Sequence, residues 1–304
     1  MRFAIPDDAT LQSQYQTAIQ DETNLFLLDR VAGGSTKPSI EAFEKPENNV
    51  KNRRADVPCW DHSRVNLSNV DSTAANDSTY IHANYVDAFS TERKFIATQA
   101  PMAQTVDDFL DMIWQNNCGN IVVLTKMVEN NEEKCYPYWS TDMGDKKSEK
   151  YTVTTIEIEE IDDYTKYTLQ LENRKVAKDF PLISLYHYTH WSENGVPADG
   201  EPTVYQFAGL VTAINIEYDE YCYCGGKFAG PIVVHGSAGA GRTGTFCAIN
   251  YCVDQYLRTK NVDVLRAVQR MRSMRHSSVM NADQYKFIFC VLKSFIEDFA
   301  RFVA

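Results

Sequence analysis

Hydrophobic and polar positions alternate along the middle of the chain. Residues 151–172, YTVTTIEIEEIDDYTKYTLQLE, contain two alternating runs around a turn, which predicts an antiparallel hairpin. Residues 182–191 alternate in the same way before the chain becomes a loop. Residues 121–125, IVVLT, and residues 232–234, IVV, are short apolar runs, the pattern of strands that are buried on both faces.

Helical periodicity occupies much of the remaining chain. Apolar residues recur at three- and four-residue spacing, so we predict amphipathic helices at residues 10–30, 105–114, 202–218, 246–257, 264–271 and 285–302. Thr105 followed three residues later by Asp108 resembles a helix-start signal for the second of these helices. We expect residues 1–40 to form an N-terminal lead-in segment and residues 41–304 to form one domain, because a Gly-Gly-Ser break lies at residues 33–35.

The composition is that of a globular protein with a sizeable core. The chain has 304 residues, of which 44% are hydrophobic and 23% charged. A formal charge of −11 argues against binding to nucleic acid, which needs a basic face. The first residues lack the apolar core of a signal peptide, and no run is long enough to span a membrane.

The cysteines indicate the compartment. Eight are scattered along the chain without the spacing of a zinc site, so we expect free thiols in a reducing environment. The sequence therefore predicts a cytoplasmic protein, a monomer, with neither a metal nor a cofactor.

One stretch carries the candidate chemistry. Residues 231–246, PIVVHGSAGAGRTGTF, run from an apolar strand through a glycine-rich loop into a helix. Such a loop gathers backbone N–H groups at a helix N-terminus, which favours an anion, and Arg242 adds a bidentate partner for phosphate. We predict that a phosphate is bound by Ser237, Ala238, Gly239, Ala240, Gly241 and Arg242.

The same letters also fit a second class of site. Residues 236–243 match the nucleotide-binding pattern G-x-x-x-x-G-K-[ST], except that Arg242 replaces the lysine. An NTPase is therefore an alternative, although the missing lysine is the one that would reach the β- and γ-phosphates.

The loop resembles the signature of the protein tyrosine phosphatases, His-Cys-(five residues)-Arg-(Ser/Thr)-Gly, with His235, Arg242 and Thr243 in place. Further blocks follow in the family's order from about residue 45 to residue 295, among them KNRRADVPCWDHSRVNL at residues 51–67. The resemblance implies an α/β (α+β) fold, a single domain whose central, highly twisted mixed sheet is flanked by helices. The short chain is also similar to the tyrosine phosphatase-like proteins of parasitoid-wasp viruses.

The resemblance breaks down where the family performs its chemistry. Gly236 stands where the family has its nucleophilic cysteine, Glu193 where a mobile loop has the Asp that acts as general acid, and Met280 where a Gln orients water. The resemblance thus implies that no catalytic residue set is intact. We predict a pseudophosphatase that is not an enzyme.

Recognition of substrate is expected from neighbouring positions. The resemblance assigns it to Arg54, Asp56 and Gln284, with Arg54 replacing a family Tyr that stacks on the substrate ring. We expect Arg54 to be solvated or to lie over an aromatic ring. The resemblance further implies that the site is surrounded by Glu129, Lys134, Trp191, His235 and Thr243.

These residues together predict a protein that binds phosphotyrosine-containing proteins without hydrolysing them. One alternative is a protein-interaction scaffold with a vestigial pocket. Another is a weakly active tyrosine phosphatase, although Ser237, which follows position 236, has no identified base to activate it.

Overall fold

The structure is a computed structural model, and it describes residues 3–20, 39–68, 79–176, 181–192, 195–197, 201–225 and 229–303. Within this part a mixed sheet has the strand order β1-β2-β3-β11-β4-β10-β9-β8-β7. Its strands are β1 (Arg64–Asn66), β2 (Tyr80–Val86), β3 (Phe95–Thr98), β4 (Asn120–Val123), β7 (Gly144–Lys147), β8 (Tyr151–Ile161), β9 (Tyr164–Asn173), β10 (Leu182–Tyr188) and β11 (Ile232–His235).

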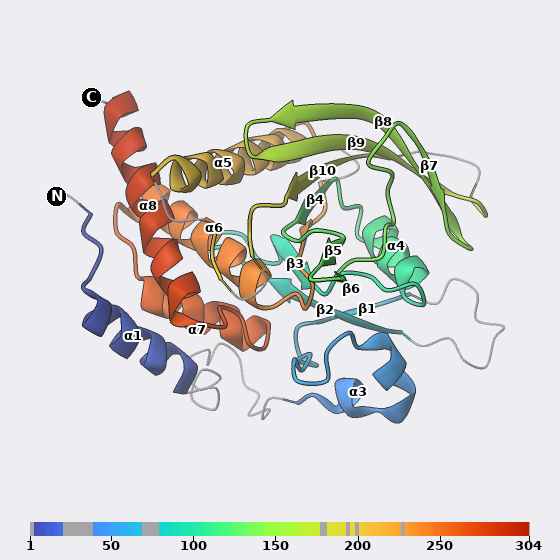
Figure 1. Ribbon diagram of the computed structural model, residues 1–304, viewed down its shortest axis with the longest axis horizontal. Helices are drawn as coiled ribbons and strands as arrows, with labels where there is room; N and C mark the ends of the chain where they lie inside the picture. The colour runs from blue at the N-terminus through green and yellow to red at the C-terminus, as the bar shows by residue number, and fades with distance from the viewer. Residues whose placement is uncertain are drawn as a thin grey trace.

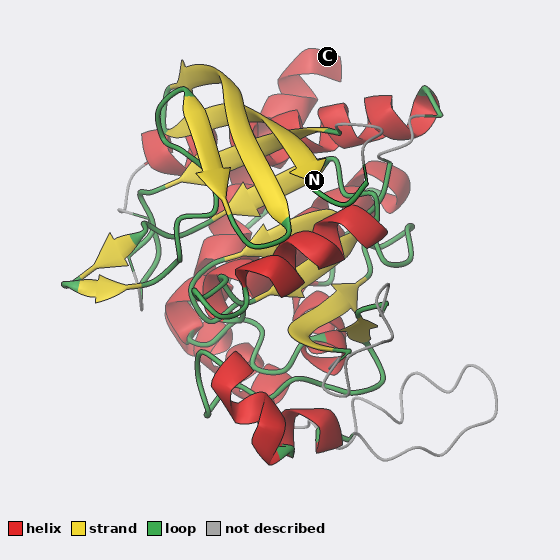
Figure 2. Ribbon diagram, turned by 90° about the vertical axis from the view of Figure 1, so that its right-hand side faces the viewer, coloured by secondary structure: helices red, strands yellow, loops and turns green. Residues whose placement is uncertain are grey.

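The centre of the sheet is parallel and its two ends are antiparallel. Strand β11 pairs in parallel with β3 and with β4, and β4 pairs in parallel with β10. The predicted hairpin is the antiparallel pair β8–β9. A separate two-stranded sheet consists of β5 (Val128–Glu129) and β6 (Glu132–Glu133). The expected fold, one domain with a central mixed sheet between helices, is confirmed (Figures 1 and 2).

Helices cover both faces of the sheet. They are α1 (Asp8–Gln20), α3 (Glu41–Glu44), the 3₁₀ helix η1 (Pro46–Lys51), α4 (Val106–Gln115), α5 (Glu201–Tyr223), α6 (Gly241–Thr259), α7 (Val264–Met274) and α8 (Ala282–Val303). Figure 1 shows α5, α6, α7 and α8 grouped on one side of the sheet and α4 apart from them.

Two hydrophobic cores explain the continuous apolar runs in the central strands. On β11, Ile232 and Val234 face the core under α5 to α8, while Val233 faces the core under α4. Because neighbouring residues of a strand point to opposite faces, a strand between two cores must be apolar at every position.

The described part of the predicted N-terminal helix belongs to the larger core. Helix α1 is described as far as Gln20, and residues 21–30 of the predicted helix lie outside the described residues. Tyr15 is buried in the core with α7 and α8, and Gln14 accepts a hydrogen bond from Tyr285. The boundary at residue 40 stays a prediction.

The helix start expected at Thr105 is confirmed, but without a side-chain capping bond. Thr105 is the N-cap of α4, but its hydroxyl makes no capping bond and instead accepts a hydrogen bond from the N–H of Met102 (2.9 Å). The Asp108 carboxylate pairs with Lys51 at 2.8 Å. The Thr105 hydroxyl is therefore used within the preceding turn, and the Asp108 carboxylate is used in a tertiary ion pair. Among the helices of the described chain, none has the length and apolarity needed to cross a membrane.

Candidate functional site

The glycine-rich loop connects the end of β11 to the start of α6. Gly239 has a φ of +68°, and a Cβ there would lie 2.1 Å from the carbonyl oxygen of Thr98, so only glycine fits. In the described chain, the N–H groups of residues 237–240 donate to no protein acceptor. Free N–H groups beside a helix N-terminus are the elements of an anion site.

The carbonyl groups of the loop fix the direction of these N–H groups. Arg275 donates to the carbonyl of Gly239 (2.8 Å) and to that of Ala238 (3.2 Å), and Ala100 N–H donates to the carbonyl of Ser237 (2.9 Å). The C=O and N–H of one trans peptide point in opposite directions. The N–H groups of Ala238, Gly239 and Ala240 therefore point away from these partners.

Arg242, on the first turn of α6, is only 5% exposed and carries the positive charge of the loop. It donates to the Glu129 carboxylate at 2.7 and 3.3 Å and to the Trp191 carbonyl at 3.2 Å. Burial alone would raise the pKa of Glu129, but the hydrogen bond and charge of Arg242 outweigh burial and lower it. Glu129 is therefore ionised at neutral pH and holds the guanidinium in place.

A pocket of about 440 Å³ opens over the loop. This volume is within the usual range for a small ligand group. Its lining brings together segments that are far apart in the sequence, namely residues 53–54, 132–134, 236–243, 280–281 and 284. The structure thus places the predicted phosphate residues, Arg54, Lys134, Met280 and Gln284 around one cavity.

Arg54 forms an ion pair with Asp56 at the mouth of this pocket. Its Nε donates to Asp56 Oδ1 at 2.8 Å, a second N–H donates to Oδ2, and the arginine side chain stays 44% exposed. The hydrogen bond from Arg54 lowers the pKa of Asp56. The two predicted recognition residues therefore act as a pair. The sequence had suggested only that Arg54 is solvated or stacks on an aromatic ring, not that it pairs with Asp56.

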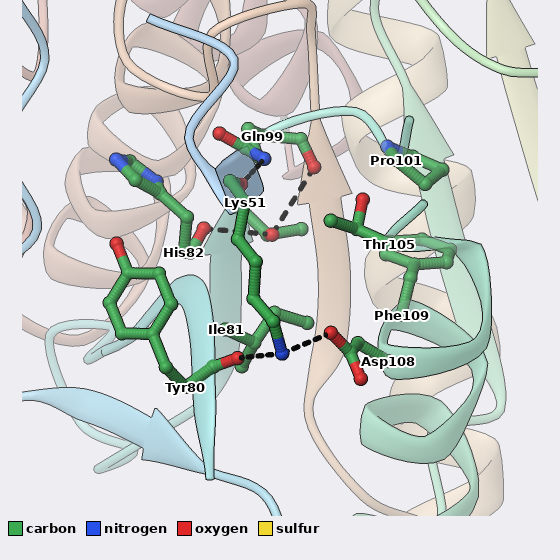
Figure 3. Close-up of a pocket in the computed structure, with 10 residues that line it drawn as sticks. Lys51, Tyr80, Ile81, His82, Gln99, Pro101, Thr105, Asp108 and Phe109 are labelled. Carbon is green, nitrogen blue, oxygen red and sulfur yellow. Dashed lines mark hydrogen bonds and ion pairs between the residues drawn. The ribbon is translucent and has the colours of Figure 1, made fainter. Parts of the chain in front are cut away.

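The segment that carries Arg54 is anchored by residues that the sequence did not single out (Figure 3). Gln99 accepts a hydrogen bond from Arg53 N–H (2.9 Å) and donates to the carbonyl of Lys51 (2.8 Å), whose ammonium group reaches Asp108. The small cavity between these residues, about 10 Å³, is the size of one water molecule and is no ligand site. Its residues position the mouth of the larger pocket.

Three of the predicted surrounding residues support the loop from inside the fold. His235 is buried, contacts Tyr138 Oη at 2.9 Å, and has its pKa lowered by burial to about 3, so it is neutral. Thr243 accepts a hydrogen bond from Gly236 N–H at 2.9 Å. Trp191 is buried and donates to the Gly195 carbonyl at 2.8 Å.

The remaining predicted residues line the pocket or lie outside the described chain. Lys134 pairs with Glu132 at 2.6 Å. Gln284 accepts a hydrogen bond from Met280 N–H at 2.9 Å, and Met280 is 43% exposed. Glu193, the predicted general acid, lies outside the described residues.

Position 236 has room for a side chain. A Cβ on Gly236 would meet its nearest neighbour, Arg242 Nε, at 3.5 Å, which is ordinary van der Waals contact. A cysteine does lie behind the loop. Cys59 is fully buried, its Sγ is 3.9 Å from an Arg275 nitrogen, and burial raises the pKa of its thiol. Arg275 therefore connects Cys59 to the back of the loop, on the side opposite to the pocket.

Comparison with known proteins identifies the relatives of this chain. Residues 48–294 match the protein-tyrosine phosphatase family. Of the relatives from Microplitis demolitor bracovirus, "Probable tyrosine phosphatase protein N1" is 38% identical over 81% of this chain and 75% of its own length, and "Tyrosine phosphatase H3" is 35% identical over 83% and 82%. The human "Receptor-type tyrosine-protein phosphatase alpha" is 35% identical over 93% of this chain but only 34% of its own length.

These comparisons confirm the predicted family resemblance and the likeness to proteins of a parasitoid-wasp virus. They remove the NTPase alternative, because the match extends far beyond the loop. They contradict the prediction that the chain is not an enzyme. Its relatives are named tyrosine phosphatases, and the chain does contain a cysteine close to the loop, Cys59. A glycine at position 236 was too narrow a basis for that prediction.

Proposed function

Because the chain belongs to the protein-tyrosine phosphatase family, we propose that it binds phosphotyrosine-containing proteins at the loop of residues 236–242 and hydrolyses them weakly. The observation that carries the proposal is the loop itself. Unused N–H groups and the nearly buried Arg242 converge at the floor of a pocket of suitable size. Such a set of donors matches a phosphate dianion.

Replacing a cysteine thiolate by Gly236 favours binding. At about 4 Å, a thiolate and one phosphate charge repel by about 1 kcal/mol in water and about 4 kcal/mol at an effective dielectric constant of 20. Against this, an additional glycine costs about 0.5–1 kcal/mol in loop flexibility. The free energy gained by removing the repulsion is at least as large as the free energy lost to loop flexibility, so phosphate affinity is retained.

Turnover is weak because position 236 supplies no nucleophile. The route that we propose is direct attack by water on phosphorus, with the charge on the phosphoryl oxygens stabilised by Arg242 and the loop N–H groups. As the new P–O bond forms, the bond to the tyrosine oxygen breaks, and Glu193 donates the proton that the leaving phenolate takes up. The attacking water passes a proton to the phosphate that is released, and Glu193 regains its proton from solvent. A thiolate nucleophile would divide the reaction into two easier steps through a covalent intermediate. This chain has no such nucleophile at position 236, so the reaction must occur in one harder step.

A second candidate is a protein-interaction scaffold that does not use the pocket for phosphate. One observation favours it. Cationic side chains of the pocket already have anionic partners within the chain, in the pairs Arg242–Glu129 and Arg54–Asp56. A phosphate group would have to compete with these carboxylates.

Titration calorimetry with a phosphotyrosine peptide separates the two candidates. Arg242→Lys keeps the charge but loses the bidentate contact, so we expect affinity to fall about tenfold or more. The unphosphorylated peptide is the matched control. If the wild type and Arg242→Lys bound the phosphorylated peptide with the same affinity, the result would favour the scaffold.

Hydrolysis is measured on the same preparations. We expect slow release of phosphate from an aryl phosphate by the wild-type protein, lower in Arg242→Lys. Equal rates in the two proteins would exclude hydrolysis in this pocket while leaving the binding proposal to be decided by calorimetry.

The compartment, the oligomeric state and the domain boundary remain proposals. We propose a cytoplasmic monomer with a lead-in segment over residues 1–40. The eight cysteines are free thiols in the structure, which supports a reducing compartment. Cell fractionation and light scattering on the purified protein test the first two points.

A further inference from the structure

A groove separate from the pocket over the phosphate loop lies between the sheet and helix α5. It has a volume of about 830 Å³, and its lining shares no residue with the pocket over the loop. Strands β8, β9 and β10 form one wall, and α5 forms the other. Figure 1 shows α5 running beside the β8–β9 hairpin.

This groove continues along α5 into a second hollow. The second hollow, of about 510 Å³, shares Ile161, Tyr164, Ala213 and Ile216 with the first. Two hollows joined in this way make an elongated surface. An extended chain segment fits that shape better than a compact small molecule.

The charge of the elongated groove is strongly negative. Among the described residues of the combined lining, Lys166 is the cation, against the carboxylates of Glu159, Asp162, Asp163, Glu217, Glu220 and Asp298. Since these carboxylates lie on both walls, a cationic ligand in the groove would be attracted from two sides.

Lys166 shows how the groove holds a cation. Its ammonium lies 2.9 Å from a Glu217 carboxylate oxygen and 5.7 Å from the centre of the Tyr186 ring. The same carboxylate accepts hydrogen bonds from the Tyr186 hydroxyl and, at 3.2 Å, from Asn120. Carboxylates next to aromatic rings are the usual surroundings of a bound ammonium or guanidinium group.

Apolar side chains are exposed in the same groove. Ile216, on α5, is 55% exposed, and Leu182, on β10, is 48% exposed. Large apolar residues that are exposed together beside a polar rim mark contact surfaces. The ligand is therefore expected to bring apolar groups as well as positive charge.

We propose that this groove docks a basic segment of a partner protein, in which Lys or Arg residues alternate with apolar ones. Its cations pair with the carboxylates on both walls, and its apolar side chains cover Ile216 and Leu182. This inference does not depend on phosphate binding at the loop.

Charge reversal tests the proposal with a defined probe. The probe is a fluorescent peptide of alternating lysine and leucine, and the full chain is titrated with it by fluorescence anisotropy. Glu159 and Glu220 are exposed, so Glu159→Lys/Glu220→Lys leaves the core intact. The matched control, Glu44→Lys/Glu92→Lys, makes the same change in net charge at exposed positions outside the groove.

We expect the groove variant to bind the peptide about tenfold more weakly and the control variant to change by less than about twofold. Equal weakening in both variants would show attraction to net charge alone and would overturn the proposal. Absence of peptide binding by the wild type would overturn it as well.

Two exposed thiols map the binding site. Cys224 lines the groove, whereas Cys222 does not, and both are exposed. We expect the peptide to slow alkylation of Cys224 and to leave that of Cys222 unchanged. Equal protection of both thiols would contradict docking in the groove. If the protein self-associated and Glu159→Lys/Glu220→Lys abolished this, the groove would be occupied by a second copy of the chain instead of a partner protein.

Discussion

At the scale of single residues, position 236 separates binding from catalysis. Gly236 lies at the start of a loop whose amides and Arg242 remain arranged for an anion, while its own side chain is missing. The groups that would stabilise a phosphate and the group that would attack it are thus independent in this chain. A single substitution can test one without disturbing the other.

Gly236→Cys is expected to raise phosphatase turnover by about tenfold or more over the wild type. The structure has room for the side chain, and a thiol at a helix N-terminus next to Arg242 has a depressed pKa, so thiolate is available at neutral pH. We expect the rate to stay below that of intact relatives, because Glu193, Met280 and Arg54 also differ from the family pattern. The measurement is release of the phenol from an aryl phosphate, with an initial burst as the cysteinyl-phosphate forms and phosphate following in the second step.

Gly236→Ser is the control for this substitution. A hydroxyl of similar size has no low pKa and no identified base, so turnover should remain at the wild-type rate. A cysteine variant that bound phosphopeptide but hydrolysed it no faster than the serine variant would contradict the assigned role of position 236.

At the scale of elements, the sequence predicted what depends on near neighbours in the chain. The apolar run of β11 and the helical periods of α5 to α8 come from local patterning, and each was found where it was expected. The loop could be recognised because its strand, glycines and Arg242 lie within one short stretch. The helix start at Thr105 was also found where it was expected, although Asp108 pairs with the distant Lys51.

Contacts between distant segments could not be predicted. Arg275 lies 36 residues from Gly239, whose carbonyl it binds, and 216 residues from Cys59. The spacing of apolar residues in α7 does not show whether Arg275, which follows the helix, is buried in the fold or exposed to solvent. The ion pair between Arg54 and Asp56 is local, and it was missed for a different reason, since the family pattern has an aromatic residue at position 54.

Two glycines on different elements give opposite expectations for the same substitution. Gly239→Ala places a methyl group 2.1 Å from the Thr98 carbonyl oxygen at a φ of +68°, so the loop must shift. We expect a loss of about 1–3 kcal/mol in the free energy of unfolding, together with weaker binding of phosphotyrosine peptide. Gly209→Ala, in open space on the exposed face of α5, should stabilise by about 0.4–1 kcal/mol and leave binding unchanged.

Urea unfolding and calorimetry on both variants check this pair. An unfolding midpoint for Gly239→Ala at or above that of the wild type would show that the close approach of the loop to Thr98 is wrong. A normal phosphopeptide affinity in Gly239→Ala would show that the loop amides are not the phosphate donors.

At the scale of the whole molecule, the fold holds several histidines in the neutral form. Burial lowers the pKa of His82 and of His235 to about 3, and for His82 the neighbouring Arg275 adds to the effect. Burial also lowers the pKa of His62 and of His187. His82 lies on strand β2 and His235 on strand β11 of the central sheet. Because both neutral histidines are part of this sheet, acid lowers the free energy of unfolding of the whole protein.

We therefore expect stability to fall as the pH drops below about 6.5, the ordinary pKa of histidine. Below this pH the unfolded chain binds protons that the folded chain does not bind. The stabilisation from these histidines is therefore fully present above about pH 6.5, and it decreases until the pH reaches their folded pKa values near 3. Between pH 7.5 and pH 5.5 each histidine with so low a folded pKa contributes a loss of about 1.4 kcal/mol, so His82 and His235 together contribute about 3 kcal/mol. Urea unfolding at the two pH values measures this loss. His235→Asn, which lacks one of the groups, should lose about 1.4 kcal/mol less than the wild type over the same interval, and an equal loss in both proteins would show that His235 is protonated inside the fold.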